Sequence, residues 1–353
     1  MYIFIQSAAT KRFRTDQFRL SIKNGIIFVL KSKDIFDNLA FEDCLYKSPN
    51  RYTSSHVPDY LLWVNEPCVV IGAFQNPWVE FQMKMARENN IKFARRYSGG
   101  GTVFHDKGNL NISYFQANKA FSRTMCMQSI ADGISSKLNK LKIEVGKRYD
   151  LWAIKDNQKP LKISGGASRL SSTSCYHHCT LLCNANLNLL QNLLKPTLEK
   201  NIESKGSKSV PSDIINLNIS TEEAKEALIE KFSYDLRKNY ATEAKVIQVD
   251  LDRDLDVFMS RDWFKEQVET LKSFNHKFGR TPPFQVQLSD GQLVTFDKGQ
   301  IKSVTGDNVS NVEDSLLVGV QLNQEGYGKI LAMKDSLVKR ELLQLFSKAL
   351  GRM

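Results

Sequence analysis

The sequence lacks several patterns that would assign it to a common class of protein. No apolar run approaches the roughly 18 to 20 residues needed to span a bilayer, and the longest run, 25–30, has the length of a strand. There is no CxxC pair, no repeat and no low-complexity tract. Its glycine-rich stretches match neither the P-loop nor the Gly-x-Gly-x-x-Gly pattern of dinucleotide-binding folds. These absences argue against a membrane-spanning protein and against the two commonest phosphate-binding loops.

The charge is strongly positive, with a formal net charge of +11 over 353 residues. Such an excess predicts an acidic protein partner or a ligand that carries phosphate. The lysines are scattered and form no basic stripe interleaved with aromatic residues, so nucleic acid is the weakest of the candidate partners. The length is sufficient for a full hydrophobic core and for two domains.

Much of the positive charge lies near the N-terminus, where residues 1–33 contain seven lysines and arginines and one acidic residue, Asp16. Basic, acid-poor leaders that contain serine and threonine are typical of mitochondrial transit peptides. We therefore expect a transit segment over residues 1–24 and a location in the mitochondrial matrix. The alternative is a basic N-terminus without a targeting role.

The cysteines Cys175, Cys179 and Cys183 are spaced by four and lie beside His177 and His178, which raises the hypothesis of a metal site. On a strand, however, Cys175, His177, Cys179 and Cys183 would share one face and would not surround one point. Thiols in a reducing compartment are usually small buried apolar groups. We predict no metal site here.

The spacing of apolar residues predicts an α+β fold with a largely antiparallel or mixed sheet. Helices are expected at 34–48, 78–89, 121–141, 186–194, 221–240, 262–274 and 336–350, and strands at 60–64, 68–71, 151–154, 161–164, 176–183, 283–288, 293–297 and 300–304. A loop rich in serine, lysine and glycine is expected at 201–211. We predict a catalytic domain over 25–243 and a small accessory domain over 244–353.

Two motifs carry most of the functional information. Three adjacent glycines, Gly99–Gly101, follow Arg96 between two predicted strands, which is typical of a turn whose backbone approaches a phosphate. The second motif places Lys162 at a strand end before a Ser-Gly-Gly turn, where an ammonium group can neutralise a phosphate or polarise an acyl carbonyl. The alternatives are a glycine-rich hairpin with surface arginines and an exposed lysine before a turn.

Together with two further segments, these motifs resemble the lipoate–protein ligase A and lipoyltransferase family. The family pattern Arg-Arg-x-Ser-Gly-Gly-Gly-x-Val-Phe/Tyr-His-Asp-x-Gly-Asn is matched at 95–109, Gln-Asn-Pro-Trp at 75–78 with Glu80 two residues on, the Lys-Val/Ile-Ser-Gly lysine at Lys162, and His-His-x-Thr-Leu-Leu at 177–182. The resemblance covers about residues 24–240. It implies the fold of biotin and lipoate protein ligases, a mixed and largely antiparallel sheet with flanking helices, plus a small α+β C-terminal domain.

The resemblance also implies a site that holds lipoyl-AMP, the mixed anhydride of lipoate and AMP. Lys162 would contact the acyl carbonyl and the phosphate, and Asp150 would orient or deprotonate the acceptor amine unless it is only a structural residue at a strand start. The implied binding residues are Arg96, Gly99, Gly100, Gly101, Thr102, Val103, Phe104, His105, Arg148, Lys162, His178, Thr180, Ser207 and Lys208. The glycines would wrap the lipoyl tail, and Arg96 with the strand after it would line the adenylate.

Three departures from the ligase pattern affect the predicted reaction. Ala73 stands where bacterial ligases have an arginine, and Pro211 and Asp213 stand where they have others. The Lys-Arg-aromatic-Asp run at 147–150, the Tyr-His-His-Cys-Thr-Leu-Leu-Cys run at 176–183 and the proline at 211 resemble the animal mitochondrial branch of the family, in which activation of free lipoate by ATP is weak or absent. Loss of arginines that would face the phosphates of ATP gives a physical reason.

We therefore predict a lipoyltransferase that acts as a monomer and moves a lipoyl group to a lysine of acidic lipoyl domains in 2-oxoacid dehydrogenase complexes. The donor is either lipoyl-AMP or a lipoylated carrier such as the glycine-cleavage H protein. A complete lipoate ligase, which would need ATP and Mg²⁺, is the alternative. Octanoyl transfer through Cys175, Cys179 or Cys183 and a non-catalytic lipoyl-binding protein are two others.

Overall fold

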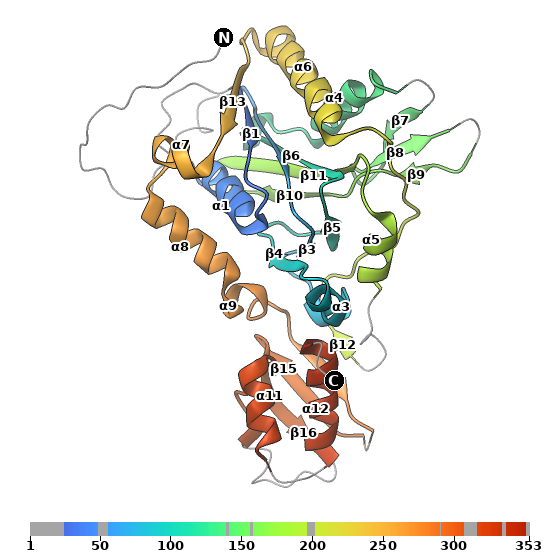
Figure 1. Ribbon diagram of the computed structural model, residues 1–353, viewed down its shortest axis with the longest axis vertical. Coiled ribbons are helices and arrows are strands. Elements are labelled where there is room, and N and C mark those ends of the chain that lie inside the picture. The colour runs from blue at the N-terminus through green and yellow to red at the C-terminus, as the bar shows by residue number, and fades with distance from the viewer. Residues whose placement is uncertain are drawn as a thin grey trace.

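The computed structural model describes residues 25–48, 56–138, 141–155, 158–195, 202–289, 291–306, 316–333 and 337–350. They form a larger α+β body and a smaller domain below it (Figure 1). The predicted transit segment, 1–24, lies outside the described residues. Among the helices of the described ranges, none has both the length and the apolar character needed to cross a bilayer.

The larger body is built on a six-stranded mixed sheet. Its strands, in spatial order, are β10 (Gly166–Leu170), β11 (Ser174–Leu182), β6 (Asn109–Ala117), β2 (Asp59–Val64), β1 (Ile26–Leu30) and β13 (Lys245–Val249). Pairing is antiparallel from β10 to β2, whereas β2, β1 and β13 run parallel. Every residue of β1, β2, β6 and β11 is buried. A sheet buried on both faces requires helices on both sides.

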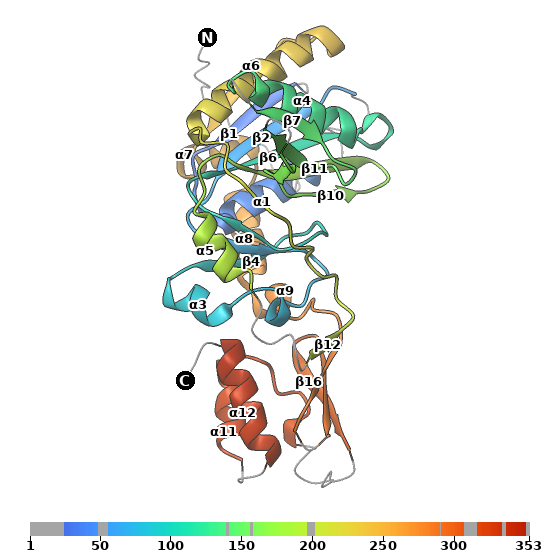
Figure 2. The same cartoon turned by 90° about the vertical axis from the view of Figure 1, so that its right-hand side faces the viewer.

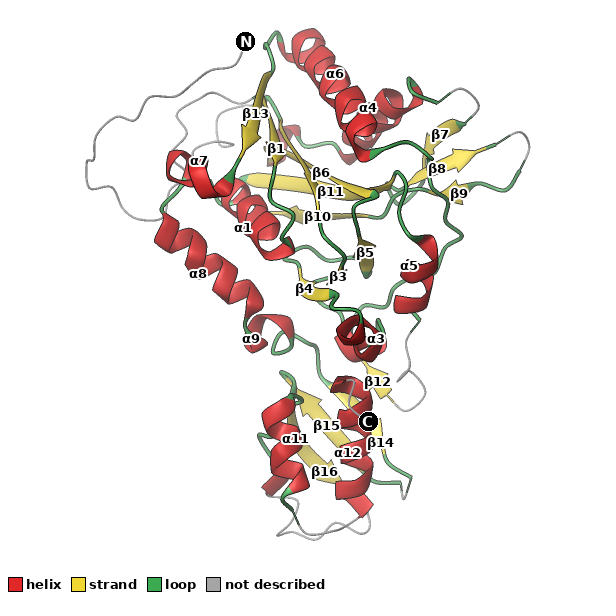
Figure 3. Ribbon diagram, in the orientation of Figure 1, coloured by secondary structure: helices red, strands yellow, loops and turns green. Residues whose placement is uncertain are grey.

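Helices supply that cover (Figure 3). One core cluster joins the sheet to α1 (Ile35–Tyr46), α7 (Leu251–Phe258) and α8 (Arg261–Lys272). Another joins it to α4 (Arg123–Ser135) and α6 (Thr221–Tyr240). Asp34 caps α1 by accepting a hydrogen bond from the Phe36 N–H (2.8 Å), and Ser220 with Glu223 forms a capping box on α6. These caps explain why both helices begin where the sequence predicts.

Two three-stranded sheets flank the cavity described below. One has the order β4 (Lys92–Arg95), β3 (Cys68–Ile71), β5 (Val103–His105), and the other β7 (Lys142–Val145), β8 (Leu151–Ile154), β9 (Leu161–Lys162). Two short helices, α3 (Met83–Glu88) and α5 (Leu187–Leu193), pack against the first of these sheets, and the 3₁₀ helix η2 (Asn118–Ala120) follows β6. The helix predicted over 78–89 is wrong in its first part. There the chain forms the short 3₁₀ helix η1 (Pro77–Val79), which ends before α3 begins. The predicted helix 121–141 ends early, at Ser135, and is followed by the unpredicted strand β7.

The smaller domain has two layers, a four-stranded sheet and two helices on one of its faces (Figure 2). The sheet order is β12 (Ile202–Ser204), β14 (Phe284–Gln287), β15 (Leu293–Asp297), β16 (Gln300–Thr305), and the helices are α11 (Gln324–Leu331) and α12 (Leu337–Leu350). The three C-terminal strands agree with the predicted ones. β12 contradicts the predicted loop at 201–211, because it finds its partner in β14, far along the chain.

The division between the two parts differs from the predicted one at 243/244. β13 pairs with β1 in the central sheet, and Phe258 of α7 packs edge-to-face against Phe28 and Phe41. The segment through α9 (Phe274–Lys277) therefore packs with the larger body, and the smaller domain begins after it. Burial of the apolar faces of α7 and α8 is the physical reason.

Two side chains of the larger body hold the smaller domain in place. Trp78 belongs to the core of the smaller domain, with its ring 5.4 Å from that of Phe278 and 5.2 Å from that of Phe284. Arg95 is fully buried and donates to the carbonyls of residues 72, 73, 75 and 277 and to the Thr281 hydroxyl (2.8 Å). Burial lowers the pKa of Arg95 to about 9, so it remains a cation at neutral pH.

Candidate active site

A cavity of about 140 Å³ lies in the larger body, between the central sheet and the two smaller sheets. The residues around it come from helix α1, the glycine loop, strands of all three sheets, the turn before β8 and the segment after β12. They are Leu39, Trp63, Val70, Arg96, Gly100, Gly101, Thr102, Val103, His105, Asn111, Arg148, Asp150, Lys162, Gly165, Gly166, Ala167, His178, Cys179, Thr180, Ser209 and Val210. Most of the predicted site residues therefore share one cavity.

Lys162 and Asp150 form an ion pair at this cavity, with Nζ 2.9 Å from Oδ2 and both side chains largely buried. The backbone of Lys162 is fixed on both sides, because its N–H donates to the Asp213 carbonyl (2.8 Å) and its carbonyl accepts from the Ile215 N–H (3.1 Å). Asp150 follows Tyr149, which has a left-handed φ of 62° and carries the Arg123 guanidinium 4.4 Å above its ring. The pair is thus held by fixed backbone at both ends.

Arg96 shapes the glycine loop from inside. Its guanidinium donates to the carbonyls of Val70 (3.1 Å), Gly99 (2.6 Å) and Gly101 (2.7 Å) and to the Ser98 hydroxyl (3.0 Å). These bonds use four of the five N–H donors of the guanidinium, so Arg96 supports the loop and contributes its charge to the cavity. Burial lowers its pKa to about 10, which keeps it cationic.

The loop also requires a glycine outside the run. A Cβ on Gly72 would lie 2.1 Å from the carbonyl oxygen of Gly100, much closer than any allowed contact. Gly100 itself has a φ of 84°, in the left-handed region. The close approach of these two backbone segments sets the shape of this wall of the cavity.

His178 connects the loop to helix α1 through buried hydrogen bonds. Its Nδ1 lies 2.9 Å from the Glu42 carboxylate, and its Nε2 lies 2.7 Å from the Ser98 hydroxyl. Glu42 also accepts from Ser113 on β6 (2.6 Å). The sequence analysis missed Glu42, although its position three residues after Leu39 places it on the buried face of α1.

One end of the cavity is apolar, with Leu39, Trp63 and Val70 in its wall. Val103 and His105 project into it, whereas Phe104 packs in the core beneath β5. The alternation of side chains along the strand turns the Phe104 ring away, while the predicted role of Phe104 concerns its backbone and stays a prediction. Burial lowers the pKa of His105 to about 3, so the ring is neutral.

The other end of the cavity is closed by the strap, the segment 205–210 that follows β12. Ser209 accepts a hydrogen bond from the Thr102 N–H (2.8 Å), accepts another from the Gln75 amide (3.1 Å) and donates to Glu80. Burial raises the pKa of Glu80, although the bonds from Ser209 oppose this effect. The strap therefore closes over the site through one serine.

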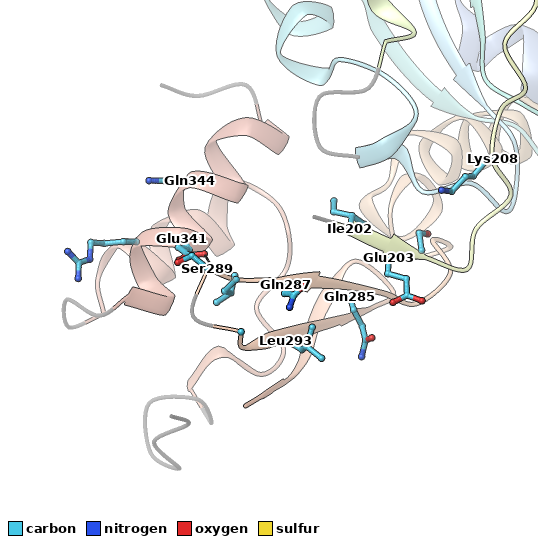
Figure 4. A pocket seen from close by; sticks show the side chains of 13 residues that line it. Ile202, Glu203, Lys208, Gln285, Gln287, Ser289, Leu293, Glu341 and Gln344 are labelled. Carbon is cyan, nitrogen blue, oxygen red and sulfur yellow. Dashed lines mark hydrogen bonds between the residues drawn. The ribbon is translucent and has the colours of Figure 1, made fainter. Parts of the chain in front are cut away.

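Three further predicted binding residues do not line the cavity. The Gly99 carbonyl is bonded to Arg96, and the side chain of Ser207 is exposed. Lys208 lines a separate hollow of about 1110 Å³ on the smaller domain, at its edge nearest the larger body (Figure 4). Ser209 and Val210 take the places expected of Ser207 and Lys208, and no sequence signal distinguishes these neighbours within a serine-rich loop.

The six cysteines are unpaired and buried. Burial raises the pKa of Cys179 and of Cys183 to about 12, which keeps both thiols protonated at neutral pH. A protonated thiol is a weak nucleophile, which disfavours an acyl-cysteine reaction. In the part of the chain that the structure describes, no group of three or more His, Cys, Asp or Glu residues could hold a metal ion.

Comparison with known sequences finds a matching family model and similar proteins. The family model of the lipoyl protein ligase A/B catalytic domain matches residues 34–233. The mitochondrial lipoyl amidotransferase LIPT1 of Homo sapiens is 40% identical over 200 residues, which cover 57% of this chain and 52% of the human protein. The LIPT1 of Mus musculus is 35% identical over 77% of this chain and 70% of its own length. A putative lipoate-protein ligase A of Saccharomyces cerevisiae is 32% identical over 78% of this chain and 66% of its own length.

Solved structures show the same fold at low sequence identity. The P. falciparum LipL1 structure with lipoate superposes with a TM-score of 0.59 at 21% identity, over 90% of this chain and 98% of that one. A lipoate-protein ligase A bound with ATP gives 0.52 at 21% identity, over 70% and 97%. The predicted fold class is confirmed.

Proposed function

The chain belongs to the lipoyl protein ligase A/B catalytic domain family, and we propose that it is a lipoyltransferase that uses lipoyl-AMP as donor. This membership confirms two predictions made from the sequence motifs, the family itself and the enzyme class, an acyltransferase. The observation that carries the proposal is the Lys162–Asp150 pair, 2.9 Å apart, in a cavity that also contains the glycine loop.

In the proposed reaction, an acceptor lysine attacks the acyl carbon of lipoyl-AMP. A carbon–nitrogen bond forms, the bond between the acyl carbon and the phosphate oxygen breaks, and AMP leaves with its electron pair. The Lys162 ammonium stabilises negative charge on the carbonyl and phosphate oxygens. A free lysine amine is almost fully protonated near neutral pH, so it must lose protons, and the proposal assigns Asp150 to accept one.

The cavity suits the two halves of this donor. Leu39, Trp63 and Val70 offer an apolar wall for the lipoyl chain, and Lys162 and Arg148 offer positive charge for the phosphate. At about 140 Å³ the cavity is smaller than the roughly 300–1,000 Å³ of typical small-molecule sites. We therefore expect the strap to move away from Thr102 when the donor enters.

The relatives named as mitochondrial lipoyl amidotransferases support a mitochondrial location, and we place the protein in the matrix. The proposed acceptors are acidic lipoyl domains of 2-oxoacid dehydrogenase complexes, which the net charge of +11 favours. A lipoylated glycine-cleavage H protein is the second candidate donor. The protein is proposed to act as a monomer.

A complete lipoate ligase is the second candidate function, because the fungal relatives carry that name. One contact argues against it. Asp213, which stands where ligases have an arginine, is paired with the exposed Lys159 at 2.7 Å, so this position offers no cation of its own to the phosphates of ATP. Exchange of pyrophosphate into ATP, driven by free lipoate with Mg²⁺, decides between the two functions, and robust exchange refutes our preference.

The direct test incubates the protein with synthetic lipoyl-AMP and an apo lipoyl domain. We expect a mass gain of one lipoyl group on one acceptor lysine, and no gain with Lys162→Ala. Lys159→Ala is the matched control, because this lysine is exposed on the same hairpin and pairs with a different aspartate. Absence of transfer by the wild-type protein would refute the proposal.

A further inference from the structure

Four segments distant in sequence bring three cations around the ring of Tyr97. The Arg169 guanidinium lies 4.9 Å from the ring centroid, the Lys47 ammonium 5.6 Å and the Arg280 guanidinium 5.7 Å. Arg169 also stacks on Tyr46 at 4.3 Å. We call Lys47, Tyr97, Arg169 and Arg280 the basic surface.

The basic surface keeps a net positive charge. Arg169 and Lys47 share a single carboxylate, that of Asp43, at 2.6 Å each. Arg280 is exposed and forms no ion pair with any residue in the described ranges. Three cations that have one carboxylate among them beside an aromatic ring, two of them on exposed side chains, are typical of a protein contact, since Tyr and Arg are enriched at interfaces.

This surface adjoins the cavity. Ala167 lines the cavity and projects from the same face of β10 as Arg169, two residues on. Tyr97 leads directly into the glycine loop, and a Cβ on the exposed Gly100 would lie 3.2 Å from the Ala167 Cβ. A lysine side chain has a stem of only four carbons, so a domain that presents its lysine to the cavity must rest on the surface beside it.

We infer that the basic surface is the docking site for the acidic acceptor domain, an inference that rests on the proposed lipoyltransferase function. The chemistry favours a protein over a small anion, because neither the cavity nor the larger hollow is lined by any of the four residues and small ligands bind in concave sites. Stacking of Arg169 between two tyrosines fixes one cation in place, while Lys47 and Arg280 face the partner's carboxylates.

The test reverses the two exposed charges, Lys47→Glu and Arg280→Glu, singly and together. At low salt we expect each single variant to lower kcat/KM for an apo lipoyl domain roughly three- to tenfold, mainly through KM, and the double variant to lower it further. The loss should shrink as salt is raised, because exposed charges are screened within about 8–10 Å near physiological ionic strength. Hydroxylamine is a small acceptor that needs no docking surface. The rate of lipoyl transfer from lipoyl-AMP to hydroxylamine should therefore be the same in the variants as in the wild type.

Lys238→Glu is the matched control, since this lysine also lies over a tyrosine ring, 5.4 Å from that of Tyr234, on the remote helix α6. It should behave as wild type. Unchanged kcat/KM for the lipoyl domain in the double variant would overturn the inference, and so would an equal loss with hydroxylamine. Fluorescence anisotropy measures binding of the apo domain to this surface even if the chain transfers no lipoyl group. This measurement separates failure of docking from failure of the proposed function.

Discussion

Acid should destabilise the protein through histidines that are buried in the neutral form, and His276 gives the clearest case. Its imidazole is buried, its Nε2–H donates to the Arg95 carbonyl (2.9 Å), and its ring lies 4.9 Å from that of Tyr97. Burial, together with Arg280 and Arg95, lowers its pKa from 6.5 to about 4. A group whose folded pKa lies below its unfolded pKa stabilises the fold above pH 6.5 and loses that contribution as the pH falls toward 4.

The magnitude follows from the proton linkage. At pH 5.5, one unit below the unfolded pKa, the contribution of His276 to the free energy of unfolding is lower than at pH 7.5 by about 1.4 kcal/mol. Burial lowers the pKa values of His105 and His177 to about 3, so each adds a loss of similar size. The three together remove about 4 kcal/mol, a large part of the roughly 5–15 kcal/mol that stabilises a typical domain.

The assay is urea unfolding of the wild type and His276→Gln at pH 7.5 and 5.5. Glutamine keeps a donor for the Arg95 carbonyl but cannot titrate. We expect the wild type to lose about 1.4 kcal/mol more than the variant between the two pH values. The exposed His56 provides the control His56→Gln, which should parallel the wild type. A constant stability difference between wild type and His276→Gln at both pH values refutes the reasoning.

Three further predictions concern the cavity. Asp150→Asn should slow single-turnover transfer from preformed lipoyl-AMP by about 10²-fold or more if Asp150 is the base, and a rate within twofold of wild type would remove it from that role. Gly72→Ala should abolish transfer, because its Cβ would lie 2.1 Å from a loop carbonyl, whereas Gly328→Ala, with nothing within 4 Å, should stay active; equal activities would contradict the clash. Ser209→Ala should lower the free energy of unfolding by about 1–3 kcal/mol, because it leaves the buried carboxylate of Glu80 with fewer hydrogen-bond donors. Chemical denaturation measures this loss, and an unchanged unfolding midpoint would mean that this serine does not hold the strap.

The sequence predicted those parts of the site that depend on local rules. Glycines at 99–101 predicted a turn with close backbone contacts, and Lys162 before Ser-Gly-Gly predicted a cation beside it. Both features are found at one cavity. Their recognition needed only residue types and short spacings, because the chemistry of each motif lies within a few adjacent residues.

Features that depend on distant partners could not be predicted in the same way. Three residues, Ile202–Ser204, form a strand only because β14 lies beside them. The expectation that Arg96 faces a phosphate could not include the four acceptors, on its own loop and on β3, to which its guanidinium donates.

The path of β12 has a consequence for how the two parts can be separated or exchanged. This strand lies in the sheet of the smaller domain, yet the chain on either side of it belongs to the larger body. Removing the chain after α9 would take away β14 and leave Ile202–Ser204 without its partner strand, directly before the strap that contains Ser209. The larger body is therefore not a module that can be cut out in one piece. A chimera with another C-terminal domain must supply a strand edge that β12 can join.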